Sequence, residues 1–265
     1  MRVACIQMCS GTDRDTNLAT VQDLLAQAAG QGAELALLPE NFSFMGGSDV
    51  EKQQLAEDQN HSVTLRFLSE QAATHQMAII GGTLLLNGCD DRIRNASPVF
   101  DARGRLLTIY DKIHLFDMDY EGESYCESAL IEAGLRPAAV SVGEYRVGLS
   151  ICYDLRFPEL FRVYADDGCD VLCNVAAFTA TTGRIHWKTL LKARAIENQT
   201  YVLASAQWGR HPDGRETWGH SMIIDPWGEV LAELPEGDGV VLAELSKKRL
   251  HQVRESLPAL RHRRM

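Results

Sequence analysis

The chain is poor in basic residues compared with acidic ones. Lys and Arg total 26 against 36 Asp and Glu, which gives a formal net charge of −10 at pH 7. This excess of negative charge repels a phosphate backbone and an anionic membrane surface. We therefore expect no nucleic-acid partner and no membrane partner, and we interpret the one basic run, residues 261–264, as a solvated or docked tail.

Long apolar runs and regular cysteine spacings are also lacking. No segment approaches the ~20 apolar residues of a membrane-spanning helix, and residues 2–8 are typical of a strand rather than of a signal peptide. The seven cysteines are odd in number and irregularly spaced, and Cys169 and Cys173 do not have the arrangement of a zinc site. We expect a cytoplasmic protein with reduced thiols and no bound metal.

Nucleotide-binding and serine-hydrolase motifs are missing as well. The chain has neither a Walker loop nor a Gly-x-Gly-x-x-Gly fingerprint. The segment Gly219-His-Ser-Met-Ile223 begins like a serine nucleophile turn but lacks the closing glycine. A Ser-His-Asp hydrolase is therefore weakly supported.

What is present is an alternation of strands and helices. Residues 2–8 predict a strand, the helical spacing of 18–28 predicts a helix, and 35–38 predict a second buried strand, so the chain begins β-α-β. Further strands are predicted at 77–86, 96–100, 105–110, 146–151, 171–175, 201–206, 221–225, 229–233 and 240–244, and helices at 61–75, 186–198 and 246–255. Residues 113–137 show no regular spacing of hydrophobic residues, which predicts a long functional loop. No linker interrupts the pattern, so we predict an α/β protein with one domain over residues 1–265.

Cys152 is the strongest single candidate for chemistry. It ends the predicted strand 146–151, and Pro158-Glu159 has the composition of a helix start, so a sharp strand-to-helix turn presents the thiol. Backbone N–H groups beside such a turn favour a thiolate. Taken alone, a buried structural cysteine is the more common situation.

A nucleophilic thiol needs a base, and the spacing of the eight histidines marks none of them for that role. Glu40 and Lys112 each follow a predicted strand, and strand ends at one sheet edge can bring them to Cys152. A carboxylate there can take the thiol proton, and an ammonium can stabilise an oxyanion. Separately, Glu40 also fits a helix-capping or surface carboxylate, and Lys112 a solvated loop lysine.

Three motifs carry a family resemblance. They are Leu37-Leu-Pro-Glu-Asn41, Tyr110-Asp-Lys-Ile-His-Leu-Phe-Asp117 and Gly148-Leu-Ser-Ile-Cys-Tyr-Asp-Leu-Arg-Phe-Pro-Glu159. In this order and spacing they resemble the nitrilase (carbon-nitrogen hydrolase) superfamily over essentially the full chain. The resemblance implies a four-layer α-β-β-α sandwich and a homodimer formed through helices next to the active-site layer.

The resemblance also implies a mechanism. Glu40 is then the general base, Cys152 the nucleophile, and Lys112 the stabiliser of the tetrahedral intermediate, with the backbone N–H of Tyr153 as second oxyanion donor. Glu127 falls where the family carries a second glutamate, and its other interpretation is a plain loop carboxylate. The substrate is a small amide, the intermediate is a thioester, and no metal or organic cofactor is needed.

Within the superfamily, residues 206–211 and 219–222 look most like the branch that hydrolyses deaminated glutathione to 2-oxoglutarate and cysteinylglycine. The ω-amidase branch, which acts on 2-oxoglutaramate, shares the catalytic motifs. Arg184 departs from the proline expected there, which puts the local pocket shape in doubt.

Either substrate carries a carboxylate, for which a guanidinium is well suited. We expect Arg156 to bind it, unless Arg156 forms a structural ion pair with Glu159 or another acid. Phe178 and Thr179 are expected to line the acyl pocket, with core packing as their alternative. Two other classes stay open: a catalytically silent binding protein of the same fold, and a Cys-His peptidase using His186 or His220.

Overall fold

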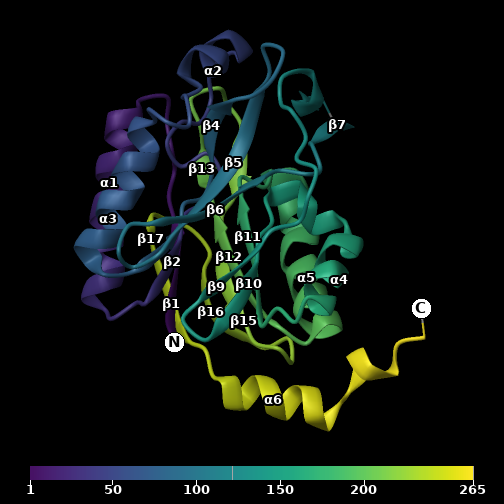
Figure 1. Cartoon of the computed structure of the whole chain (residues 1–265). Helices are drawn as coiled ribbons and strands as arrows, with labels where there is room; N and C mark the ends of the chain where they lie inside the picture. The colour runs from purple at the N-terminus through teal and green to yellow at the C-terminus, as the bar shows by residue number, and fades with distance from the viewer. Residues whose placement is uncertain (121, 265) are drawn as a thin grey trace.

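The structure, a computed structural model, describes residues 1–120 and 122–264. Two β-sheets pack face to face, and helices cover the outer face of each sheet (Figure 1). The predicted four-layer α-β-β-α sandwich is confirmed.

The first sheet has the strand order β17-β1-β2-β3-β5-β4, and β6 pairs with β5 outside this path. Strands β1, β2 and β3 run parallel, and the other pairings are antiparallel. The strands are β1 (Arg2–Gln7), β2 (Leu35–Leu37), β3 (Ala78–Ile80), β4 (Leu84–Asn87), β5 (Ile93–Phe100), β6 (Leu106–Asp111) and β17 (Gly239–Glu244).

The second sheet has the order β16-β15-β12-β11-β10-β9, with β10, β11 and β12 parallel. Its strands are β9 (Ala139–Val142), β10 (Tyr145–Gly148), β11 (Val171–Ala176), β12 (Tyr201–Ala206), β15 (Ser221–Ile224) and β16 (Val230–Leu234). Two small hairpins stand apart, β7 (Asp117–Tyr120) with β8 (Glu123–Cys126), and β13 (Trp208–Arg210) with β14 (Glu216–Trp218).

Helices α1 (Arg14–Gly30) and α3 (Val63–His75) cover the first sheet, and α4 (Pro158–Asp166) and α5 (Ala180–Asn198) cover the second (Figure 1). The short α2 (Asp49–Leu55) lies at one end of the sheets, near β7, and α6 (Lys247–Ser256) extends beyond the opposite end. Three 3-10 helices complete the described chain: η1 (Glu127–Ala129), η2 (Cys152–Arg156) and η3 (Ala259–His262).

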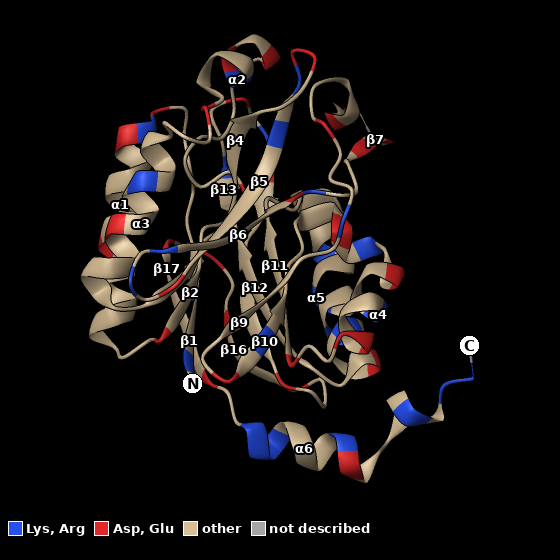
Figure 2. Ribbon diagram, viewed as in Figure 1, with Lys and Arg blue, Asp and Glu red and all other residues tan. Residues whose placement is uncertain are grey.

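Strand β1 shows why the central strands are apolar throughout. Val3 and Cys5 pack between the two sheets, while Ala4 and Ile6 pack on the helix side, and all four are fully buried. A strand that is covered on both faces needs apolar residues at every position. Charged side chains instead lie along the helices and loops, where Figure 2 shows acidic and basic residues interspersed.

Two predictions about local structure are wrong. The predicted strand 77–86 is two strands, β3 and β4, because the chain breaks at Gly82, which has φ +50° and whose missing Cβ would lie 2.1 Å from the Pro39 carbonyl oxygen. Residues 113–137 are not simply a loop, since they contain the β7–β8 hairpin and η1; Glu121 lies outside the described residues. Polar residues dominate this hairpin, so its sequence does not show the alternation of apolar and polar residues that predicts a strand.

Among the described residues, no helix has both the length and the apolar composition to cross a membrane. Within the same ranges, no group of three or more His, Cys, Asp or Glu side chains is arranged to hold a metal ion.

Candidate active site

Glu40 lies just beyond the end of β2, where the sequence placed it. Its carboxylate is almost completely enclosed, with the side chain 4% exposed. One oxygen, Oε2, accepts the backbone N–H of Ala177 at 2.8 Å, and the other, Oε1, accepts the Asn95 amide at 2.9 Å. Two separate segments of the chain therefore hold this carboxylate in one orientation.

Lys112 follows β6 directly and is equally enclosed, with its side chain 2% exposed. Its ammonium nitrogen lies 2.9 Å from Glu40 Oε1 and 2.8 Å from Glu127 Oε2. Glu127, at the start of η1, also accepts the backbone N–H of Phe116 at 2.7 Å. The structure thus brings Glu40, Lys112 and Glu127 together in a buried network of two carboxylates and one cation.

Cys152 begins η2 with a left-handed backbone, φ +44°. This conformation is uncommon for a residue with a side chain, and such strain persists only where the surroundings impose it. Asp154, fully buried, supplies part of that constraint: it accepts the backbone N–H of Ile151 at 2.9 Å and the Tyr110 hydroxyl at 2.7 Å. The sharp strand-to-helix turn expected at Cys152 is confirmed, and α4 begins at Pro158 as predicted.

The thiol and the ammonium have perturbed acidities. Burial raises the pKa of the Cys152 thiol well above its usual value, and the negative charge of Glu40 raises it further, whereas Lys112 acts in the opposite direction. Burial alone would lower the pKa of Lys112, but Glu127 and Glu40 outweigh it, so its pKa is raised. At neutral pH the resting site therefore holds a protonated thiol beside a charged ammonium.

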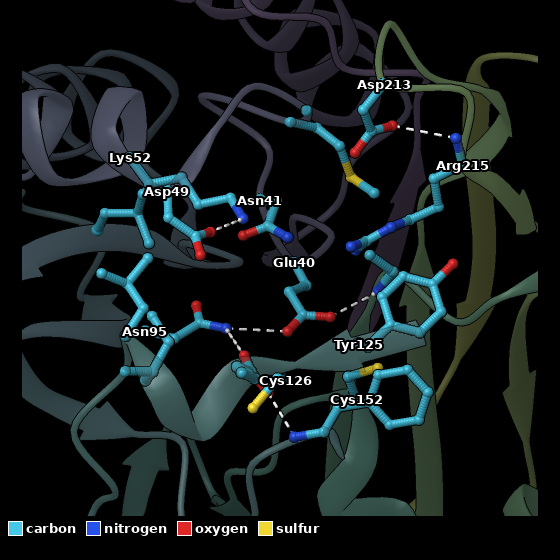
Figure 3. Close-up of a pocket in the computed structure, with 18 of the residues that line it drawn as sticks. Glu40, Asn41, Asp49, Lys52, Asn95, Tyr125, Cys126, Cys152, Asp213 and Arg215 are labelled. Carbon is cyan, nitrogen blue, oxygen red and sulfur yellow. Dashed lines mark hydrogen bonds and ion pairs between the residues drawn. The ribbon is translucent and has the colours of Figure 1, made fainter. Parts of the chain in front are cut away.

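Cys152, Glu40, Lys112 and Glu127 all line one cavity of about 310 Å³. It opens at the end of the sheets near α2 and the β7–β8 hairpin, and Asn95, Tyr125 and Arg215 are among its other walls (Figure 3). A volume of this size holds a small organic molecule. A thiol, a carboxylate and an ammonium in such an enclosure can together perform nucleophilic attack, proton transfer and stabilisation of an oxyanion.

The backbone N–H of Tyr153 lies in the first turn of η2, next to the thiol. N–H groups in the first turn of a helix have no acceptor within that helix. Tyr153 therefore meets the structural requirement for a second oxyanion donor.

Arg156 lies on η2 beside this turn, and its guanidinium stands over the rings of Phe178 at 5.0 Å and Tyr153 at 5.7 Å. Its Nη1 is 3.0 Å from His186 Nδ1, and among the described residues no carboxylate forms an ion pair with it. The alternative ion pair with Glu159 is not present. Arg156 therefore has no acidic partner among the described residues, and it stands outside the walls of the 310 Å³ cavity.

Phe178 and Thr179 are both buried and stand outside the walls of the 310 Å³ cavity. Phe178 packs on Trp187 with ring centroids 5.1 Å apart, and the Thr179 hydroxyl is 2.9 Å from that of Thr182. Phe178 also contacts the Arg156 guanidinium, while Thr179 occupies the N-cap position of α5.

The two histidines considered for a Cys-His pair have other partners. His186 contacts Arg156, and His220 Nδ1 lies 2.8 Å from Glu233. Within the described part of the chain, neither imidazole has a hydrogen bond to Cys152. The charged groups that shift the pKa of the thiol are Glu40, Lys112 and Glu127 instead, so the structure does not support the Cys-His alternative.

Sequence reasoning missed most of the other residues that line the cavity, among them Asn95, Tyr125 and Arg215. A signal existed only for Asn95, which is a polar residue next to an apolar strand and therefore needs a buried partner. Tyr125 belongs to the unpredicted hairpin, and Arg215 follows Pro212-Asp-Gly214, which is typical of an exposed turn.

The fold and this site define a class of hydrolase, and comparison with known proteins agrees. The chain belongs to the carbon-nitrogen hydrolase family, whose profile matches residues 2–255. It is therefore an enzyme that hydrolyses carbon–nitrogen bonds other than peptide bonds.

Three relatives illustrate the similarity. The chain is 44% identical over 265 residues to the deaminated glutathione amidase of Synechocystis sp., covering 98% of this chain and 97% of that protein. It is 36% identical over 266 residues to the chloroplastic omega-amidase of Arabidopsis thaliana, covering 99% of this chain and 72% of that protein. The crystal structure of the C. elegans NitFhit protein superposes with a TM-score of 0.93 at 36% identity, covering 99% of this chain and 65% of that one.

Proposed function

We propose that the chain is a cysteine-dependent amidase in which Cys152 is the nucleophile, Glu40 the general base and Lys112 the stabiliser of the oxyanion. The observation that carries the proposal is the enclosure of all three side chains in one cavity, with the Lys112 ammonium 2.9 Å from the Glu40 carboxylate. The roles follow from chemical type: a buried protonated thiol needs a neighbouring base before it can attack.

Acylation begins when Glu40 accepts the thiol proton as the Cys152 sulfur bonds to the amide carbon. The carbonyl oxygen becomes an oxyanion, which accepts hydrogen bonds from Lys112 and from the backbone N–H of Tyr153. The contacts of the Lys112 ammonium with Glu40 Oε1 at 2.9 Å and with both Glu127 oxygens, at 3.0 and 2.8 Å, hold its three N–H donors beside the thiol. The carbon–nitrogen bond then breaks, Glu40 returns its proton to the departing nitrogen, and a thioester remains.

Deacylation uses the same carboxylate. Glu40 takes a proton from water, the hydroxide oxygen attacks the thioester carbon, and the carbon–sulfur bond breaks. The proton on Glu40 returns to the Cys152 sulfur, so the enzyme is regenerated and neither a metal nor an organic cofactor takes part. Glu127 acts as a positioning residue, because its 2.8 Å contact holds the ammonium in place.

We propose deaminated glutathione as the substrate, cleaved to 2-oxoglutarate and cysteinylglycine. The support is the 44% identity with a relative of that name over nearly the full length of both proteins. Arg156, which has no acidic partner among the described residues, is the residue we assign to the carboxylate of the acyl chain, and Phe178 supports its guanidinium. The neighbouring assignment, an ω-amidase acting on 2-oxoglutaramate, draws support from the 36% identity with the Arabidopsis enzyme.

The test is a comparison of kcat/KM for deaminated glutathione, 2-oxoglutaramate and a simple aliphatic amide. The proposed function predicts the highest value for deaminated glutathione, and a higher value for 2-oxoglutaramate would move the assignment to the ω-amidase. Cys152→Ala serves as the inactive control. Hydrolysis of none of the three by the wild type would favour a silent binding protein.

We further propose a homodimer formed through α4 and α5. Its support is that three apolar residues on these helices are exposed to solvent: Val163 is 50%, Ile185 65% and Ile196 51% exposed. Sedimentation should give a dimer at micromolar concentration, and Val163→Glu together with Ile196→Glu should give a monomer. A wild-type monomer would contradict the proposed homodimer.

The seven free cysteines support a reducing compartment, which we take to be the cytoplasm.

A further inference from the structure

We propose that Arg215 binds the carboxylate of the leaving group, in a subsite separate from the one that holds the acyl chain. The inference rests on the proposed function. Cysteinylglycine carries a carboxylate of its own, whereas the ammonia released from 2-oxoglutaramate carries none. An amidase for deaminated glutathione therefore benefits from a cation on the leaving-group side of the thiol, and an ω-amidase does not.

Three cationic side chains line the cavity: Lys52, Lys112 and Arg215. Lys112 is held by its two carboxylates, and Lys52 pairs with Asp49 at 2.9 Å. The Arg215 guanidinium differs, because residues 1–120 and 122–264 supply no carboxylate in an ion pair with it, and its Nε is buried without a hydrogen-bond partner. Of the three cavity cations, it is the one without an ion pair among the described residues.

The guanidinium is aimed at the cavity. Figure 3 shows the Arg215 side chain extending inward toward Glu40. Its terminal carbon stands 4.5 Å from the centre of the Tyr125 ring. Stacking uses the face of the guanidinium and leaves its N–H edge free, and that edge is the part that binds a carboxylate in a bidentate manner.

The backbone beneath Arg215 is anchored before any ligand arrives. Its carbonyl accepts the backbone N–H of His211 at 2.8 Å, and its own N–H bonds the Asp213 carboxylate at 3.0 Å. His211 is 3% exposed, and its two ring nitrogens lie 2.9 Å from the Ser10 carbonyl and 2.8 Å from the Thr217 hydroxyl. A group held in this way loses little entropy when it binds an anion.

Arg215 and Arg156 occupy different ends of one row of aromatic rings. Arg215 stands over Tyr125, and Arg156 stands over Tyr153. Phe116 lies between these rings, with centroid distances of 5.2 Å to Tyr125 and 5.1 Å to Tyr153. The two guanidiniums are thus separate cationic positions, and Arg215 is the one that lines the cavity. A substrate that carries one carboxylate at the end of its acyl chain and another at the end of its leaving group needs two such positions.

The experiment compares wild type with two variants. Arg215→Met keeps an apolar side chain that can pack on Tyr125, and Arg215→Lys keeps the positive charge but not the bidentate N–H geometry of the guanidinium. The substrates are deaminated glutathione, the same molecule with its glycine carboxylate capped as a carboxamide, and 2-oxoglutaramate. We expect Arg215→Met to lower kcat/KM for deaminated glutathione by about 10- to 100-fold, as for loss of a charged hydrogen-bond pair. Arg215→Lys should recover part of this loss.

The capped substrate isolates the interaction. Capping should lower the wild-type kcat/KM to a similar extent, and adding Arg215→Met should lower it little further, because the two changes remove the same contact. The preference for deaminated glutathione over 2-oxoglutaramate should fall in the variant. Arg210→Met, at an exposed position on the same hairpin and away from the cavity, is the matched control that should keep the preference.

The inference is overturned if Arg215→Met loses the same factor in kcat/KM for deaminated glutathione and for 2-oxoglutaramate. It is also overturned if the wild-type enzyme has the same kcat/KM for the capped and the uncapped substrate. If wild type favours deaminated glutathione and Arg215→Met keeps that preference, only the inference fails. If wild type favours 2-oxoglutaramate, the proposed function fails and the inference falls with it.

Discussion

The Lys112 ammonium lies 2.9 Å from the Glu40 carboxylate with both side chains almost completely shielded from solvent. A buried ion pair adds little stability overall, but removing one partner leaves an unpaired buried charge. Here removal of Lys112 would leave two carboxylates without their cation, because Lys112 also pairs with Glu127 at 2.8 Å. The pair is therefore a structural element of the cavity as well as a source of its chemistry.

Replacing Lys112 should destabilise the protein far more than replacing an exposed lysine. Lys112→Met should lower the free energy of unfolding by about 3–5 kcal/mol and lower kcat by about 10²- to 10³-fold through loss of an oxyanion donor. Lys52→Met is the matched control, since its pair with Asp49 is 31% and 64% exposed and costs about 0–1 kcal/mol. Urea denaturation measures the free energy of unfolding of both variants, and an equal decrease in Lys112→Met and Lys52→Met would contradict the structure.

The resting thiol should be neutral. Burial and the charge of Glu40 raise the pKa of Cys152, so the proton is bound at neutral pH and leaves only in alkaline solution. A pH titration of thiolate absorbance, taken as wild type minus Cys152→Ser, should show no thiolate at neutral pH. Glu40→Gln should move the midpoint to lower pH, because a negative charge that disfavours the thiolate is gone. Thiolate absorbance at neutral pH in the wild type would contradict this.

Gly82 should be required for the correct position of Glu40. A Cβ at Gly82 would lie 2.1 Å from the carbonyl oxygen of Pro39, the residue before Glu40. Gly143 has a similar φ, +55° against +50°, but a Cβ added there would have no heavy atom within 4 Å. Gly82→Ala should therefore cost about 2–5 kcal/mol and lower kcat, whereas Gly143→Ala should cost about 1–2 kcal/mol and leave kcat unchanged. Indistinguishable variants would show that Gly82 has no special role.

The catalytic candidates were predictable because each follows an apolar run. Glu40 and Cys152 follow apolar segments that are buried on both faces, and Lys112 follows the β-prone strand β6, whose first residues are exposed. These strands were visible in the sequence, and their order permitted the three residues to meet at one sheet edge. The three-motif resemblance then supplied the fold and the roles. The predicted single domain over residues 1–265 stays a prediction.

The other walls of the cavity depend on tertiary packing that no local pattern reports. Tyr125 lies on a short hairpin whose strands are mostly polar and exposed, and the turn before Arg215 looks like an ordinary surface loop. The backbone of Arg215 is bonded to His211, which in turn contacts Ser10, a residue about 200 positions away in the chain. Such long-range contacts are invisible to periodicity, which is why substrate recognition was harder to predict than the catalytic set.

The central claim is that Cys152 forms an acyl thioester under the control of Glu40. Rapid acid quenching during turnover of deaminated glutathione, followed by peptide mass spectrometry, tests it most directly. We expect one 2-oxoglutaryl group on the peptide that contains Cys152, and none on that peptide in Cys152→Ala, which should be inactive. Continued release of cysteinylglycine by Cys152→Ala, or turnover in the wild type with the acyl group on another residue, would contradict it.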